Sequence, residues 1–149
     1  MPFEPATFDA AYMMHVGMNI PDKDTLFAEI RRVLKPGGMF AVFDVMLTGR
    51  GELRFPLPCA TTPDLAFFAT AAEYRRAIEA AGFAVVCERD RREQACSFFR
   101  SPAGAGPVPA SPLGVHLLLR DDPHEVFRNV VAMFEGAALA PTEMICRAT

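Results

Sequence analysis

Two polar side chains stand at the ends of apolar runs, where they could take part in proton transfer and amine binding. His15 follows the run Phe8–Met14 (FDAAYMM), and Asp44 lies near the end of Met39–Met46 (MFAVFDVM). A neutral histidine can accept a proton near pH 7, and a carboxylate can hold a cationic amine by a charge-assisted hydrogen bond. If the two runs are neighbouring parallel strands, both side chains face one crevice at the carboxyl end of a sheet, where such sheets bind ligands.

The segment between these runs predicts a helix that connects two parallel strands. Asp22 or Asp24 can cap its start, because a carboxylate accepts from the free N–H groups of the first turn. Residues 35–38 (KPGG) should end it, since proline cannot continue a helix and glycine readily adopts a positive φ. A buried strand–helix–strand unit of this kind predicts a right-handed parallel crossover. The helix buries one apolar stripe, formed by Leu26, Phe27, Ile30, Val33 and Leu34.

The rest of the chain alternates helix and strand signals with two long connections. A capping box, T-x-x-E, begins at Thr70 and opens a helix that Gly82 should end. The order of elements predicts an α/β fold, a three-layer αβα sandwich. Residues 47–69 form a long connection, typical of a binding loop, and residues 102–114 a loop rich in proline and glycine. The remaining expected elements are a strand at Phe83–Glu88, a short apolar piece at Val115–Leu119, a helix capped by Asp121 or Asp122 with Pro123 first, and a strand at Leu139–Arg147.

The composition is that of a globular domain with no sign of a nucleic-acid or membrane partner. Its 149 residues are 51% hydrophobic and 22% charged, with a net charge of −3. No basic field favours nucleic acid, and no apolar run approaches the roughly 20 residues that span a bilayer. The four cysteines are scattered without a C-x-x-C pair, so a metal site is not expected. Isolated thiols and the lack of a signal-peptide pattern predict a cytoplasmic protein.

Several motifs carry a likeness to a known family. FDAAY, the helix ending RRVLKPGG and the strand MFAVFDV together resemble the second half of class I S-adenosylmethionine-dependent methyltransferases. More narrowly, HVGMNIPDK, FPLPCA, AEYRRAIEAAGF and the tail from LGVHLLL to TEMICR look like the sarcosine/dimethylglycine N-methyltransferase-like group, within methyltransferase type 11. The likeness runs over nearly all of residues 1–149. It implies the carboxyl-terminal part of one methyltransferase domain, a partial Rossmann-like fold that holds the fourth to seventh strands, the last antiparallel.

The resemblance also implies a cofactor and the roles of particular residues. The cofactor would be S-adenosylmethionine, although the first three strands and the glycine-rich loop that grips it would be missing from this chain. The methyl acceptor would be a small molecule, an amine, beside the acceptor-side loop 47–69. Cys59 stands where the group usually has tryptophan and Phe43 where it often has histidine, which leaves the acceptor open. In the implied site His15 is the base or the residue that positions the acceptor, and Asp44 binds the amine. The methionine part of the cofactor would be bordered by His15, Val16, Met18 and Asn19. Arg54 and Phe55 would reach the acceptor's carboxylate and methyl groups.

Other interpretations of the same residues stay open. His15 could cap the strand end through backbone bonds, and Asp44 could cap a turn or pair with a lysine. The chain could be a non-catalytic half-domain, because the strand Phe8–Met14 would expose an edge that pairs with a second copy or with a complementing amino-terminal half. A fragment of a nicotinamide-dependent dehydrogenase is a third possibility. No G-x-G-x-x-G fingerprint supports that third possibility.

Overall fold

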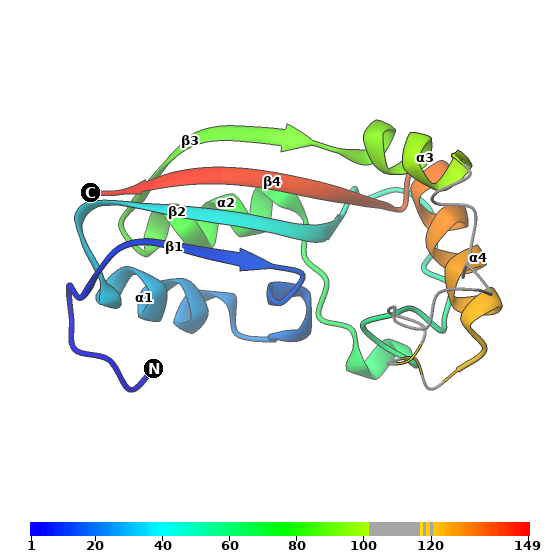
Figure 1. Ribbon diagram of the computed structural model, residues 1–149, viewed down its shortest axis with the longest axis horizontal. Coiled ribbons are helices and arrows are strands. Elements are labelled where there is room, and N and C mark those ends of the chain that lie inside the picture. The colour runs from blue at the N-terminus through cyan, green and yellow to red at the C-terminus, as the bar shows by residue number, and fades with distance from the viewer. Residues whose placement is uncertain (102–116, 118, 120) are drawn as a thin grey trace.

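A four-stranded mixed sheet organises the protein in our computed structural model, which describes residues 1–101, 117, 119 and 121–149 (Figure 1). The strand order is β1-β2-β4-β3; β1 runs parallel to β2, and β4 runs antiparallel to both β2 and β3. The α/β class is therefore confirmed. The strands are β1 (Phe8–Met14), β2 (Leu34–Leu47), β3 (Phe83–Asp90) and β4 (Leu139–Ala148), and the helices are α1 (Lys23–Val33), α2 (Ala71–Ala80), α3 (Arg92–Arg100) and α4 (Pro123–Glu135), with short 3₁₀ turns η1 (Gly17–Asn19) and η2 (Pro63–Leu65).

The crossover from β1 through α1 to β2 forms as expected, but α1 ends earlier than the glycines suggest. The Asp22 carboxylate caps the helix by accepting from the Thr25 N–H at 2.9 Å. α1 ends at Val33, so the helix stops within two residues of the predicted segment 35–38. Leu34 is already extended, with φ −87° and ψ 139°, and residues 35–38 belong to β2. Pro36 disfavours a helical conformation at Lys35, the residue before it, and cannot itself continue the helix, so the helix cannot run on through this segment.

Two helices cover one face of the sheet, and two lie together at one end of it (Figure 1). Alternate side chains of β2 point into the main core, where Phe40 and Val42 pack with Phe27 of α1 and Tyr74 of α2. The intervening side chains of β2 point to the opposite face. Near the end of β2 that face is covered by α3, α4 and the connection after β2, which form a second apolar cluster around Leu139.

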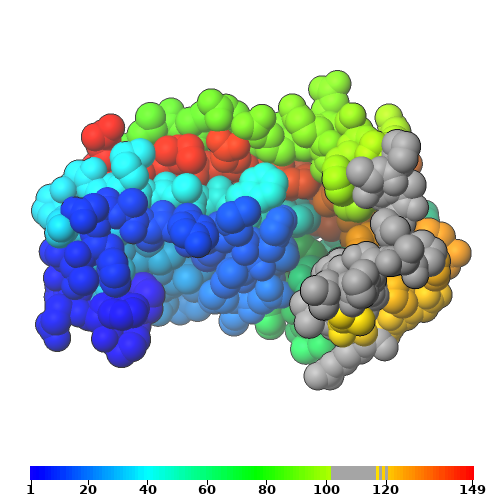
Figure 2. All heavy atoms as spheres, viewed as in Figure 1, coloured from blue at the N-terminus to red at the C-terminus, as the bar shows by residue number. Residues whose placement is uncertain are grey.

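The first strand is open to solvent, contrary to the expectation of a buried strand. Of the side chains of β1 only Met13 is buried, while Tyr12 is 79% and Met14 56% exposed. The reason is that Met13 points to the face that α1 and α2 cover, whereas Tyr12 and Met14 point to the opposite face, which those helices do not cover. β1 also lies at the edge of the sheet, hydrogen-bonded to β2 alone. Figure 2 shows this blue segment uncovered along the face toward the viewer.

The second half of the chain confirms most of its expected elements. The capping box is present, with Thr70 and Glu73 bonded reciprocally, and the Asp122 carboxylate accepts from the His124 N–H at the start of α4. Helix α3 was not expected, because residues 89–101 show charge followed by aromatics rather than a clear start signal. The predicted loop 102–114 lies outside the described residues, as does most of the apolar piece Val115–Leu119.

Candidate functional site

A large cavity of about 1030 Å³ opens at the carboxyl ends of β1 and β2. Its floor is the face of the sheet opposite α1 and α2, with Phe43 and Val45 from β2 and Pro141 and Glu143 from β4. Its sides come from η1, the connection after β2, α3 and α4. In Figure 2 the surface is hollowed between the blue segment after β1 and the orange α4. The sheet therefore carries its cavity where open α/β sheets bind ligands.

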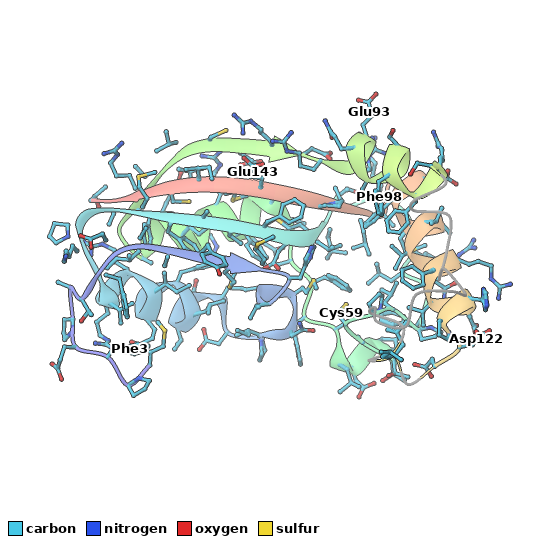
Figure 3. The ribbon with its side chains drawn as sticks, viewed as in Figure 1. Phe3, Cys59, Glu93, Phe98, Asp122 and Glu143 are labelled. Carbon is cyan, nitrogen blue, oxygen red and sulfur yellow. The ribbon has the colours of Figure 1, made fainter. Side chains whose placement is uncertain are left out.

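The cavity wall is mainly apolar and rich in aromatic rings. Figure 3 shows Phe98 of α3, Cys59 of the connection and Glu143 of β4 coming from three separate segments of the wall, whereas Glu93 points away from the body of the protein. Burial raises the pKa of the Cys59 thiol, which keeps it protonated and weakly nucleophilic. Six phenylalanines line the cavity: Phe43, Phe68, Phe98, Phe99, Phe127 and Phe134.

His15 stands at the mouth of this cavity in a strained backbone conformation. Its φ is +54°, in the left-handed region that costs a residue with a β-carbon about 1–2 kcal/mol. Its N–H donates to the Phe43 carbonyl at 2.9 Å, and its ring meets the Phe43 ring edge-on with the centroids 5.2 Å apart. The side chain is exposed and lines the cavity. Strain of this kind persists where the surroundings hold it and often marks functional positions.

Asp44 lies on the other face of β2, beneath the turn that carries His15. The side chain is fully buried; Oδ1 accepts from the Val16 N–H at 2.9 Å and Oδ2 from the Tyr74 hydroxyl at 3.1 Å. Burial raises the pKa of Asp44, and the two hydrogen bonds oppose that rise. The pKa of Tyr74 is also raised, first by burial and then by the neighbouring carboxylate. A β-carbon on Gly17 would lie 2.5 Å from Asp44 Oδ2, so only glycine fits above this carboxylate.

The structure brings together some of the predicted site residues and separates others. His15, Met18 and Asn19 line the cavity, but Asp44 does not. Val16 is placed by its bond to Asp44, while Arg54 is exposed and Phe55 packs in the apolar cluster around Leu139. Neither Arg54 nor Phe55 lines the cavity among the described residues.

Most of the cavity wall comes from residues that the sequence did not single out. Phe98 and Phe99 of α3 line the cavity, as do Arg91 and Glu143, and none of these four residues has a role in the site expected from the sequence. A signal exists in the helical spacing of Phe127, Val130 and Phe134, which places the three side chains on one face of a helix.

An ion pair is the main charged feature of the cavity wall. Arg91 donates through Nε and Nη2 to Glu143 Oε2, at 3.1 and 2.8 Å, and Arg89 donates to Oε1 at 2.8 Å. These bonds hold the pKa of Glu143 below its usual value, with the bond from Arg91 contributing most. Glu143 is therefore ionised at neutral pH, and both of its oxygens are occupied.

Neither a metal site nor a membrane-spanning helix is present in the part of the chain that the structure describes. No group of three or more His, Cys, Asp or Glu side chains is arranged to hold a metal ion there. No helix among the same residues is long and apolar enough to cross a membrane.

The fold and cavity define a Rossmann-like α/β protein with a ligand site at the carboxyl end of its parallel strands, and sequence comparison identifies the family it resembles. Residues 1–42 match the family described as methyltransferase domain. The chain is 52% identical over 48 residues to sterol 4-C-methyltransferase strm-1 of Caenorhabditis elegans. This match covers 32% of this chain and 14% of that protein. It is 44% identical over 48 residues to squalene methyltransferase 1 of Botryococcus braunii, covering 32% and 13% respectively.

Solved structures extend the likeness to the whole chain at the level of the fold. Geranyl diphosphate C-methyltransferase from Streptomyces coelicolor, solved with S-adenosyl-L-homocysteine, superposes with a TM-score of 0.73 at 13% identity, over 100% of this chain and 49% of that one. A candidate sarcosine dimethylglycine methyltransferase from Galdieria sulphuraria gives 0.69 at 18%, over 99% and 55%. The chain thus spans about half the length of these neighbours.

The expected resemblance to class I S-adenosylmethionine-dependent methyltransferases is confirmed by these comparisons. The sequence match carries this resemblance for residues 1–42. Over the rest of the chain the solved structures show the fold alone.

Proposed function

We propose that this chain is the acceptor-binding part of an S-adenosylmethionine-dependent methyltransferase that acts on a small molecule. The observation that carries the proposal is the cavity beside His15, which opens directly after the strand that lies in the methyltransferase match. The cofactor, when bound, would supply the electrophilic methyl group. His15, Met18 and Asn19 fit its methionine part, since they converge at the mouth of the cavity with a ring, a thioether and an amide.

The acceptor group is, in this proposal, an amine whose nitrogen lies near His15. An ammonium has no free lone pair, so it must lose a proton before it can accept a methyl group. The imidazole of His15 would take that proton, and the alignment of nitrogen and methyl group would come from the cavity walls. Asp44 would then be a positioning residue, because its carboxylate holds the backbone that presents His15 rather than the cavity surface.

The groups that hold the adenosine part of the cofactor would come from sequence outside these 149 residues. The sequence has no glycine-rich turn between a strand and a helix, which is the usual cradle for a nucleotide. We therefore expect isothermal titration of the isolated chain with S-adenosylhomocysteine to give no saturable heat below about millimolar concentration. Binding at micromolar concentration or tighter would contradict this part of the proposal. Adenosine, titrated in parallel, controls for weak binding of the base alone.

A second candidate function is that of a non-catalytic half-domain that associates through β1. The exposed edge and the exposed side chains of Tyr12 and Met14 favour it, because an unpaired strand edge is a template for another strand. A symmetric dimer would be the simplest closure.

Light scattering at micromolar concentration tests this second function. We expect a dimer for the parent chain and a monomer for Tyr12→Lys, since an exposed lysine on an edge strand opposes pairing. Val86→Lys is the matched control, as Val86 is 60% exposed on β3 at the other edge of the sheet. A monomeric parent chain, or a dimer that only Val86→Lys disrupts, would exclude association through β1.

A further inference from the structure

The size of the cavity is the first observation that bears on the acceptor. At about 1030 Å³ it reaches the upper end of the range for sites that enclose drug-sized ligands, about 300–1,000 Å³. Even with the methionine part of the cofactor beside His15, an acceptor with a handful of heavy atoms would leave much of this volume to water, held against apolar walls.

The chemistry of the walls is the second observation. Rings from β2, α3 and α4 face the cavity, and the side chain of Phe98 is 55% exposed, as is usual for a binding surface rather than a closed core. Each methylene group placed against such a surface leaves water and adds to binding. The length of the wall, from His15 to α4, therefore favours a long apolar ligand.

The pairing of the charges is the third observation. A short zwitterionic amine needs a cation for its carboxylate, and Arg91 is the only arginine or lysine on the described wall. Two of its nitrogens already donate to Glu143. Arg54, the residue predicted to bind an acceptor's carboxylate, is exposed and lies off the wall.

We infer that the methyl acceptor carries an extended hydrocarbon body, of the kind that a long alkyl or isoprenoid chain presents, with its accepting atom at the His15 end. The body lies along the phenylalanines between the sheet and helices α3 and α4. This inference rests on the proposed function, which places the accepting atom of the ligand at the His15 end of the cavity. It names the class of substrate that the same site would bind.

Two secondary amines with the same reactive group separate the classes of acceptor. N-methyldodecylamine and sarcosine both carry an N-methyl amine, but only the first has a long apolar body. Calorimetry on the chain should show one site for N-methyldodecylamine, below its micelle concentration, and no binding of sarcosine. Phe98→Gln should weaken that binding about tenfold, because it places a polar group on the wall. Val86→Gln, an equally exposed apolar position away from the cavity, should leave the binding unchanged.

The outcomes distinguish this inference from the proposed function. Equal weakening by Val86→Gln would indicate adsorption to exposed apolar surface and would overturn the inference. Methyl transfer to sarcosine without binding of N-methyldodecylamine would also overturn it, and would leave the proposed function standing. Binding of N-methyldodecylamine in the cavity, with no methyl transfer to any acceptor in any preparation, would overturn the proposed function, and with it the assignment of this ligand as a methyl acceptor, and would leave the cavity as a binding site for long apolar molecules. Circular dichroism of both variants checks that they fold.

Discussion

Replacing Asp44 by alanine is expected to lower the free energy of unfolding by about 2–4 kcal/mol. The change leaves the Val16 N–H and the Tyr74 hydroxyl without their acceptor, and each buried unsatisfied group costs about 1–3 kcal/mol. Removal of a desolvated carboxylate offsets part of that sum. Urea unfolding followed by circular dichroism measures the loss. A change below about 0.5 kcal/mol would contradict the role of Asp44 in holding the turn after β1.

The matched control is Asp44→Asn, which keeps the shape of the side chain and its hydrogen-bonding capacity. Its oxygen can accept from Val16, and its amide can donate to the Tyr74 oxygen.

The difference in unfolding free energy between the parent chain and Asp44→Asn should also depend on pH, and burial of Asp44 sets the sign of that dependence. Because burial raises the pKa of Asp44, the folded state binds that proton more tightly than the unfolded chain. The stability of the parent relative to Asp44→Asn should therefore be greatest below the ordinary value of 3.8 and fall as the pH rises through the raised pKa.

The central fold was predictable because its signals are local. Asp22, Thr70 and Asp122 cap helices through side-chain bonds within their own first turns, so the sequence around each is enough. The end of α1 was predicted to within two residues, because Pro36 cannot continue a helix and restricts Lys35 before it.

The burial of β1 was mispredicted for a different physical reason. An apolar strand has the same sequence pattern whether both of its faces are covered or only one, and only the layers packed on the sheet decide. Tyr12 and Met14 point to the face opposite Met13, which neither α1 nor α2 covers.

The candidate site was predictable only at the strand ends. Topology alone places His15 beside β2, since Met14 aligns with Phe43 in the parallel register. The same topology does not say which face of the sheet Asp44 points to. Neighbouring residues of a strand point to opposite faces, so either Phe43 or Asp44 could face the cavity, and the register of the strand decides between them. The walls from α3 and α4 depend on contacts between distant segments, which no local pattern encodes.

Removing the imidazole of His15 is expected to lower the rate of methyl transfer by about 10²–10⁴-fold, the range for loss of a general base. His15→Gly and His15→Asn are the informative variants, since both residues tolerate the positive φ at this position. Neither change should reduce the free energy of unfolding by more than about 0.5 kcal/mol, because the exposed ring makes one edge-on contact, with Phe43. A loss of activity with retained stability therefore isolates the chemistry of the ring from its packing.

The measurement is transfer from radiolabelled S-adenosylmethionine, made in whichever preparation is active, the chain alone or the chain combined with a complementing amino-terminal half. Added imidazole should partly restore His15→Gly, because the lost side chain leaves a space beside the cavity mouth that the free base can enter. The pH dependence separates the two roles left open for this residue. A base must be neutral to act, so its loss should flatten the rise in rate with pH, whereas loss of a mere positioning contact should lower the rate equally at every pH. Unchanged activity in both variants would remove His15 from the site and leave its strained backbone as a feature of the turn alone.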